Sequence, residues 1–479
     1  MTRDVTMRST WSGLRLFSRA DYRFFFSSSM SPCFSLVYFS LGVVISLIFL
    51  RLKDAYLGPP ESEAPLVQRR EVGVFQMFPP SMHLEMQRHV SPEFDVSTSS
   101  KKIETTNRSY VCFTGNTIEA FSSIQAAKEM IASGKMDKAQ RLFEHALALA
   151  PNSPDILNYY GEFLESTKAD IVEADHHYLK ALIRSPGHSA ALVNLGRISA
   201  LVEEMDNSVL RRIDGKRDTV SRIPETNAAL MKAKREAYYQ HIYHTVGIEG
   251  NTMTLSQTRT IVETRMAVGG KSIAEHNEIL GLDAALKYIN TTLIHRIGRL
   301  TIEDILELHK RVLGFADPTE GGAFRRTQVF VGDHVPPAPS SIPPLMSEFK
   351  EWLNSWKSMT LHPVRYAALA HYKLVHIHPF HDGNGRTSRL LMNMILMNAG
   401  YPPVIILKQD RLRYYQVLEA ANEGDVRPFM RFIAECTERT LDLFLWSTSE
   451  YSSEVSAIEP VPEIVGSHHS CYKQITPDT

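Results

Sequence analysis

The chain has 479 residues, which is enough for two or three domains of roughly 150 residues each. Its 52 basic and 53 acidic side chains give a net charge of −1, so we expect no broad basic surface for nucleic acid. Apolar residues make up 43% and charged residues 22%, which is typical of folded proteins and excludes a disordered chain. The four cysteines form no CxxC pair, which argues against a disulfide scaffold or a cysteine-built zinc site.

An apolar segment near the N-terminus has the length of a membrane span. No charged residue occurs between Phe24 and Leu50, and about 20 apolar residues in a helix cross the hydrocarbon core of a bilayer. We therefore expect a single transmembrane signal anchor at residues 31–50, in preference to a cleaved signal peptide or a buried helix. Five arginines predict that residues 1–30 stay in the cytosol and that the remainder crosses the membrane.

Residues 51–118 contain prolines, serines and charges without a sustained apolar period, and we expect them to form a stalk. Acceptor sequons begin at Asn107 and Asn290, which makes both asparagines glycosylation candidates in a lumenal protein. Glycosylation at either position would agree with the orientation that the N-terminal arginines predict.

Residues 119–188 contain a repeated pattern of small, aromatic and proline residues. Small residues let two helices approach closely, an aromatic ring fills the space between them, and proline ends the second helix. The pattern resembles a pair of tetratricopeptide repeats, with ordinary helical hairpins as the alternative, and such repeats provide concave surfaces for binding a partner. The matching positions are Ala127, Ala139, Phe143, Ala146 and Pro151, then Gly161, Ala174, Tyr178, Ala181 and Pro186.

The remainder of the chain is expected to be mainly α-helical. Residues 189–228 are interpreted as a linker helix that ends near Val202, followed by a charged connector. Residues 229–446 show the helical spacing of apolar residues and form the largest domain, with a core at about residues 300–435. Residues 447–479 are interpreted as a C-terminal tail.

Two local signals mark elements within the largest domain. Thr301 and Asp304 form a capping signal that opens a helix. Alternating β-branched residues at 327–331, followed by Gly332 and a pair of prolines, predict one short β-hairpin. The predicted fold is therefore mainly α with a single β-hairpin.

Residues 378–389 form a loop that opens a helix, and they carry the chemistry of the chain. Glycines let several backbone N–H groups turn toward one anion, and the start of a helix adds partial positive charge. Arg386 and Arg389 lie three residues apart on one helical face, where they could bind further phosphate oxygens. Asp382 is a hard oxygen ligand suited to magnesium, and His378 is a natural proton acceptor. These residues predict nucleotide phosphates and transfer to a hydroxyl. A metal hydrolase is the alternative, with the awkwardly spaced ligands His376, His378 and His381.

The same residues match the signature HxFx(D/E)GNGRxxR at every defining position, so the chain resembles the Fic family, enzymes that transfer AMP from ATP to protein side chains. The resemblance implies that His378 is the general base, that Asp382 holds Mg²⁺ or Mn²⁺, and that Phe380 anchors the loop. It also implies an all-α Fic core with a β-hairpin flap, and contacts from Tyr414 and Asn422 to the base and ribose of ATP, the co-substrate. The implied phosphate and nucleotide ligands are Gly383, Asn384, Gly385, Arg386, Thr387, Ser388 and Arg389 in the loop and Val331, Gly332, Asp333 and His334 in the flap.

Residues 245–251 resemble the inhibitory motif (S/T)xxxE(G/N) of the same family. The resemblance implies that Glu249 pairs with Arg389, which the γ-phosphate needs, so that ATP binds with its α-phosphate misaligned for attack. Glu249 would also position the attacking water when AMP is removed from a modified protein. The alternative is an ordinary glutamate at the C-terminus of a helix.

The whole arrangement resembles the metazoan endoplasmic-reticulum members of the Fic family. The resemblance implies a single-pass type II protein of the endoplasmic-reticulum membrane with a lumenal catalytic domain. Its implied partner is the lumenal Hsp70 chaperone BiP, to which it adds AMP on Ser or Thr and from which it removes AMP. It further implies a homodimer through the Fic domain, with residues 273–286 as the contact. The alternatives are a Fic transferase that uses another nucleotide donor and a catalytically silent, repeat-based chaperone adaptor.

Overall fold

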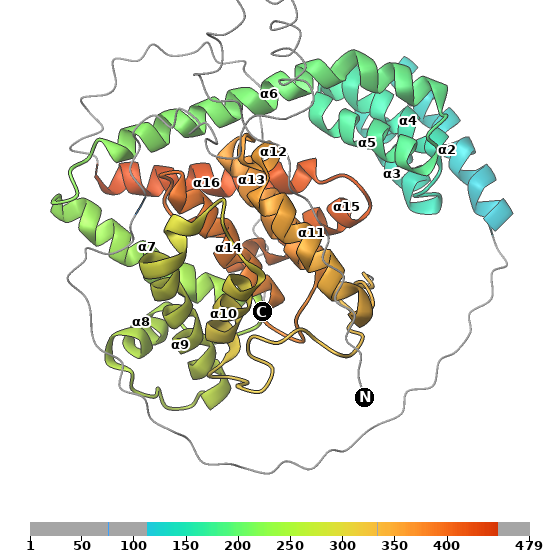
Figure 1. The fold of residues 1–479 in the computed structure, drawn as a ribbon. Helices are drawn as coiled ribbons and strands as arrows, with labels where there is room; N and C mark the ends of the chain where they lie inside the picture. The colour runs from blue at the N-terminus through green and yellow to red at the C-terminus, as the bar shows by residue number, and fades with distance from the viewer. Residues whose placement is uncertain (1–74, 76–112, 333, 449–479) are drawn as a thin grey trace, which may run out of the picture. The chain divides into compact units, whose positions relative to one another are not determined.

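The computed structural model describes residue 75, residues 113–332 and residues 334–448 (Figure 1). Within these ranges the structure contains no helix that is both long enough and apolar enough to span a membrane. The expected anchor at residues 31–50 and the sequon at Asn107 lie outside the described residues, as do Asp333 and nearly all of the expected tail.

The first described helices form two hairpins (Figure 1). They are α2 (Phe113–Ala132) with α3 (Met136–Leu149), and α4 (Pro154–Phe163) with α5 (Ile171–Arg184). The positions that the repeat pattern singled out lie on their buried faces, among them Ala127, Ala139, Phe143, Ala146, Gly161, Ala174, Tyr178 and Ala181. At Gly161 the helices are so close that a Cβ would lie 2.6 Å from the ring of Tyr178. The predicted hairpins are therefore present, with the first helix starting inside the expected stalk, whereas their assignment as tetratricopeptide repeats stays a prediction.

α6 (Ser189–Ser221) is a single helix of 33 residues. It continues past Val202 as far as Ser221, so the expected end of the helix near Val202 was wrong, and the expected charged connector is reduced to residues 222–227. Leu210 and Ile213 are buried in this stretch, and α6 packs against α16 (Arg427–Ser447). An apolar stripe on one face stabilises a helix whose other face is charged and exposed.

Residues 228–447 form a second group of helices. Three of them, including the one that follows Thr301, begin with a capping box in which the N-cap and N3 side chains bond to each other's backbone N–H. Besides α16 and short 3-10 and π turns, the group comprises α7 (Ala228–Ile248), α8 (Leu255–Thr264), α9 (Ile273–Tyr288), α10 (Ile302–Leu313), α11 (Ile342–Asn354), α12 (Trp356–Met359), α13 (Pro363–Ile377), α14 (Asn384–Asn398) and α15 (Arg411–Asn422).

α14 lies at the centre of this group, where it packs against α7, α9, α10 and α13 (Figure 1). Every residue of α14 except Gly385 is buried. A helix whose side chains are apolar on most sides is stable only when other elements cover it all round. The loop that precedes α14 is therefore attached to a helix that is fixed along its whole length.

The expected β-hairpin is reduced to one antiparallel bridge. Val331 N donates to His334 O at 3.0 Å, and His334 N donates to Val331 O at 3.1 Å. No strand occurs among the described residues. The prolines that follow, Pro336 and Pro337, have no N–H and cannot extend a β-ladder. We call residues 327–337 the flap segment.

α5 contacts the turn between α15 and α16. Arg427 forms ion pairs with the buried Asp175 and with Asp425, and His176 Nδ1 lies 2.9 Å from Asp425 Oδ2. Farther along α5, Lys180 and Arg184 both pair with Glu423. These contacts join the second hairpin to the residues that directly follow Asn422.

Candidate active site

The loop between α13 and α14 is closed by Asn384. Phe380 N donates to Asn384 Oδ1 at 3.0 Å, and Asn384 Nδ2 donates to Phe380 O at 2.8 Å. Gly383 is the N-cap, with a left-handed φ of 77°. Since the first helical hydrogen bond runs from Thr387 N to Gly383 O, the N–H groups of residues 384–386 have no partner within the helix. We call these N–H groups the anion cradle, because the helix dipole adds positive potential to them.

His378 ends α13 and begins the loop. Its φ of 50° lies in the left-handed region, which residues other than glycine seldom adopt outside turns and functional sites. The Nδ1–H donates to Val375 O at 3.2 Å, which leaves the lone pair of Nε2 free. Burial lowers the pKa of His378 to about 4, and the charges of Arg325 and His334 act in the same direction. The side chain is therefore a neutral potential base near neutral pH.

Asp382 presents an exposed, ionised carboxylate at the start of α14. Gly383 N donates to Asp382 Oδ1 at 2.6 Å and Arg386 Nη2 donates to Oδ2 at 2.7 Å. Although partial burial opposes ionisation, Arg386 and the Gly383 N–H hold the pKa of Asp382 below its ordinary value. A single carboxylate beside a phosphate site fits Mg²⁺, which usually keeps several waters and binds one or two carboxylates together with substrate phosphates.

The next feature is whether protein side chains alone could hold a metal ion, as a metal hydrolase would require. Among the described residues, which include His376, His378 and His381, no group of three or more His, Cys, Asp or Glu side chains is arranged to hold a metal ion. The donor set at Asp382 is therefore the one that fits a divalent ion in this region, with the phosphates of a nucleotide completing it.

Arg389, one turn into α14, is held by a carboxylate from α7. Its Nη2 donates to Glu249 Oε1 at 2.5 Å and to Thr245 O at 3.0 Å, and its Nη1 lies 3.4 Å from Tyr414 Oη. Arg389 as a whole is 1% exposed. Although burial disfavours the charge, Glu249 and Tyr414 raise the pKa of Arg389 above its ordinary value. The arginine therefore stays charged inside the protein.

The carboxylate of Glu249 also lies against the anion cradle. A Cβ built on Gly385 would come within 2.4 Å of Glu249 Oε1 and 3.0 Å of Arg389 Nη1. Glycine is required at this position because the carboxylate occupies the space of a side chain. An anionic group therefore already fills the volume in front of the cradle.

Residues 299–396 match the model of the Fic/DOC family. A protein of Aedes aegypti described as protein adenylyltransferase Fic is 61% identical over 363 residues, which is 75% of this chain and 73% of that protein. The Drosophila melanogaster protein of the same description is 62% identical over 340 residues, covering 71% of this chain and 69% of that one. The chain belongs to the Fic family of protein adenylyltransferases. The solved structure of Fic-1, residues 134–508, from C. elegans superposes with a TM-score of 0.64 and 42% identity, covering 69% of this chain and 98% of that one.

As a Fic adenylyltransferase, the chain uses ATP to modify a protein substrate. The Fic loop presents the groups that this reaction needs: a neutral imidazole at His378, an anion cradle, and two arginines in the first turns of α14. Of the predicted loop residues, Thr387 uses its N–H in the helix, and the hydroxyls of Thr387 and Ser388 are buried without a hydrogen-bond partner. Phosphate binding by these two residues stays a prediction.

Tyr414 does not lie where a ligand of the adenine base would be expected. Its side chain is 1% exposed, and its hydroxyl contacts Arg389 Nη1 at 3.4 Å and His371 Nε2 at 3.0 Å. Its neighbour Tyr415 is 37% exposed, with the two rings 5.3 Å apart. The structure therefore places Tyr414 beneath Arg389, and Tyr415 is the tyrosine that solvent reaches.

Asn422 and the flap segment meet at His376. The exposed Asn422 contacts His376 Nδ1 through its Oδ1 at 3.0 Å, and the ring of His334 lies 5.0 Å from the ring of His376. The flap residues Val331 and His334 are half-buried, and Gly332 is exposed with a φ of 58°. The structure thus brings one end of α15 and the flap segment to the same side of α13.

Two residues of the Fic site were not found from the sequence. His309 stacks on Phe380 at 3.6 Å between ring centroids, accepts from Gly322 N at 3.0 Å through Nδ1, and donates from Nε2 to Asp382 O at 2.9 Å. Arg325 is 2% exposed and bonds to the carbonyl of His378. Neither belongs to the loop signature, and both act through contacts with distant parts of the chain.

Proposed function

We propose that this Fic enzyme transfers AMP from ATP to a Ser or Thr hydroxyl of the lumenal Hsp70 chaperone BiP, that Glu249 inhibits the transfer, and that the same site removes AMP. The observation that carries the proposal is the pair between Glu249 and Arg389 at 2.5 Å in front of the anion cradle. A carboxylate at this place competes with the outer phosphate of ATP for the same guanidinium.

In the transfer step, the target hydroxyl oxygen attacks the α-phosphorus of ATP, and the bond from that phosphorus to pyrophosphate breaks. His378 takes the hydroxyl proton on Nε2, which is free because Nδ1–H is bonded to Val375 O. The anion cradle, Arg386 and Arg389 bind the phosphates and hold the α-phosphorus in line. A Mg²⁺ or Mn²⁺ ion held by Asp382 and phosphate oxygens would neutralise part of the developing charge.

In the removal step, water attacks the phosphorus of the AMP-modified side chain, and the bond to the Ser or Thr oxygen breaks. Glu249 accepts a proton from that water and later releases it to solvent, and the departing Ser or Thr oxygen takes up a proton from solvent, so that one water is consumed and the products are AMP and the free hydroxyl. The position of Glu249 against Gly385 supports this role, because its carboxylate lies at the mouth of the phosphate site. A single glutamate would then inhibit transfer and promote removal.

The first assay compares three full-length variants with the unmodified protein, using radiolabelled ATP and purified chaperone. Glu249→Gly should increase labelling by about a hundredfold, because the outer phosphate regains Arg389, and adding His378→Ala should abolish it. Glu348→Gln, an exposed glutamate on α11, is the matched control and should leave labelling unchanged. In a second assay, Glu249→Gln should stop release of AMP from modified chaperone. Unchanged labelling by Glu249→Gly, or continued release by Glu249→Gln, would contradict the proposal.

We further propose that the enzyme is a type II protein of the endoplasmic-reticulum membrane, anchored by residues 31–50, with its Fic domain in the lumen. The charge pattern of the N-terminus supports this orientation. Asn107→Gln and Asn290→Gln variants test it, since each should lose one endoglycosidase-sensitive mass increment. Asn290 is half-buried in a π turn, and its Oδ1 has no hydrogen-bond partner, so Asn107 is the stronger candidate. Absence of any such increment would argue against a lumenal body.

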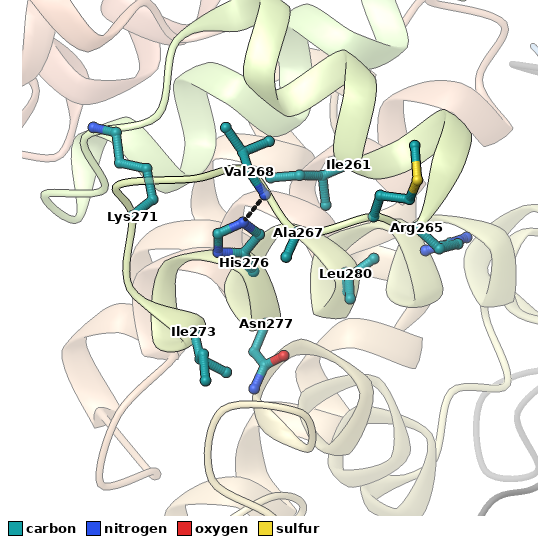
Figure 2. A pocket seen from close by; sticks show the side chains of 10 residues that line it. Ile261, Arg265, Ala267, Val268, Lys271, Ile273, His276, Asn277 and Leu280 are labelled. Carbon is teal, nitrogen blue, oxygen red and sulfur yellow. Dashed lines mark hydrogen bonds between the residues drawn. The ribbon is translucent and has the colours of Figure 1, made fainter.

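A homodimer through the Fic domain is the last part of the proposal. In the expected range 273–286 the later residues, including Leu282 and Leu286, are buried, whereas Ile273 is 79% exposed. Ile273 borders a cavity of about 220 Å³ between α8 and α9, near the 63% exposed Met266 (Figure 2). An exposed apolar patch of this kind favours a protein contact. Ile273→Asp should therefore lower the sedimentation coefficient to that of a monomer, and an unchanged coefficient would exclude this surface.

A further inference from the structure

Arg325 is a buried cation that bonds to backbone carbonyls instead of a carboxylate. It is 2% exposed, and its guanidinium appears in none of the ion pairs of the described residues. Nε donates to His378 O at 2.7 Å, Nη1 to Thr327 O at 2.9 Å, and Nη2 to Pro337 O at 2.5 Å. Its own backbone N–H donates to Pro379 O at 2.9 Å. One side chain thus contacts the Fic loop and both ends of the flap segment.

This arrangement is costly, since a buried charge without a counterion loses its hydration. Burial accordingly lowers the pKa of Arg325 below its ordinary value. Three carbonyl acceptors offset part of the loss, and they match the planar fork of a guanidinium, which the compact ammonium of lysine cannot reproduce. The three hydrogen bonds of Arg325 fix the Fic loop relative to the flap segment, which explains why a charged residue is buried here.

That geometry concerns a well-supported segment, the Fic loop, and the flap segment, which has little other support. The flap segment contains one isolated bridge, between Val331 and His334, and no β-ladder. His378 has a left-handed backbone, a strained conformation that persists only where the surrounding structure holds it. Arg325 bonds to the carbonyl of His378 and, through the same guanidinium, to Thr327 and Pro337. The distance between the base and the flap segment therefore depends on this side chain.

We propose that Arg325 is a positioning residue for AMP transfer: it fixes both ends of the flap segment to the backbone of His378, so that a target hydroxyl entering between them meets the base in one orientation. The inference rests on the proposed role of His378 as base. It predicts a defect in the use of the protein target with little change in ATP binding, because the anion cradle and the two phosphate arginines belong to α14. Arg325 contacts Thr327 and Pro337 at the ends of the flap segment, and not residues 331–334, which the family resemblance assigns to the nucleotide.

The test uses full-length Glu249→Gly protein with Arg325→Lys added, and Arg326→Lys as the matched control on the exposed neighbour. We expect Arg325→Lys to lower kcat/KM for the chaperone by about tenfold or more, because small displacements of a base reduce the rate steeply. The Kd of ATP should change by less than about twofold. Arg326→Lys should change neither. A kcat/KM equal to that of Arg326→Lys would overturn the proposal, and so would a parallel loss of ATP affinity, which indicates a general structural role.

Hydrogen exchange provides a readout that does not depend on activity. In Arg325→Lys, the backbone N–H groups of the flap segment should exchange faster than in Arg326→Lys, while those of α14 stay protected. Equal exchange in the two variants would overturn the proposal. If Glu249→Gly itself transfers no AMP, the proposed function fails, but the exchange and ATP-binding results still decide the role of Arg325.

A milder variant covers the case in which Arg325→Lys does not fold. The exposed Gln328 donates from Nε2 to Pro336 O at 2.8 Å, a side-chain hydrogen bond across the flap segment in addition to the two backbone bonds of the bridge. Gln328→Ala should lower kcat/KM for the chaperone by about threefold, with ATP affinity unchanged, because one hydrogen bond is worth about 1 kcal/mol. No change in kcat/KM would contradict the proposal that holding the two ends of the flap segment together is needed for efficient modification of the target.

Discussion

Arg389 is oriented by its neighbours so that it can pair with Glu249 or, as we propose, with the outer phosphate of ATP. Its guanidinium is held from three sides, by the Glu249 carboxylate, the Thr245 carbonyl and the Tyr414 hydroxyl. Tyr414 is in turn bonded to the fully buried His371. Removal of Glu249 therefore leaves two of the three contacts, and the arginine stays oriented toward the space that we propose for the outer phosphate of ATP.

Tyr414→Phe tests this orientation in the Glu249→Gly background. The variant loses the contact to Arg389 and leaves His371 without its partner, so we expect ATP affinity to fall by about tenfold and the free energy of unfolding by about 1–3 kcal/mol. Calorimetric titration with ATP and urea unfolding measure the two effects. Tyr243→Phe, on a half-buried tyrosine of α7, is the control. Unchanged ATP affinity in Tyr414→Phe would show that the Tyr414 hydroxyl does not orient Arg389 for ATP.

The pKa of His378 predicts how the rate of AMP transfer changes at acidic pH. Only the neutral imidazole accepts a proton, and burial lowers its pKa to about 4. The rate of AMP transfer by Glu249→Gly should therefore stay level as the pH falls through 6.5, where an ordinary histidine is half protonated, and decline below about pH 5. The negative charge of Glu249 raises the pKa of His378. Its loss in Glu249→Gly therefore lowers this pKa and extends the level region to lower pH.

A pH–rate profile of kcat/KM, with samples returned to neutral pH to verify that activity recovers, provides the measurement. A midpoint near pH 6.5 with full recovery would show that His378 is solvated during the reaction and would contradict this assignment.

At the scale of elements, local patterns predicted most of the helices and missed the contacts between distant segments. The capping signal at Thr301 correctly placed α10, and the Fic signature placed the loop before α14. The charged stretch after Val202 was wrongly assigned because its buried stripe depends on α16. His309 and Arg325 reach carbonyls 73 and 53 residues away, at Asp382 and His378, so no short pattern could have found them.

The junction of α5 with α16 gives a prediction at the same scale. Arg427→Met leaves Asp175, which is 0% exposed, as a buried charge without its partner, and we expect a cost of about 3–5 kcal/mol. Arg197→Met removes an ion pair to Glu165 from an arginine that is 54% exposed, which should cost less than about 1 kcal/mol. Urea unfolding compares the two. A similar small cost for both would mean that the Asp175 carboxyl is protonated in the folded protein.

For the whole molecule, buried histidines make stability depend on pH. Burial lowers the pKa values of His241, His244 and His309 to about 4 each, and that of His371 well below its ordinary value. Since the unfolded chain binds these protons at about pH 6.5, their contribution is complete above that pH and is lost as the pH falls toward 4. The loss at pH 5.5 is on the order of 1 kcal/mol per histidine.

Urea unfolding midpoints at pH 7.5 and pH 5.5 test this dependence. His244→Gln should reduce the difference between the two midpoints, because one of the buried titrating groups is gone. His145→Gln, whose parent side chain is 51% exposed, should leave the difference unchanged. Equal midpoints at the two pH values in the unmodified protein would show that the buried histidines become protonated without unfolding.

The missing side chain at Gly385 limits which substitutions could release the proposed inhibition. A methyl group there would clash with the Glu249 carboxylate, and on the proposed mechanism it would also stand in the place of the nucleotide. A larger residue at position 385 would then remove the proposed inhibitor and block the substrate at once, whereas a change at Glu249 itself would remove the inhibitor alone.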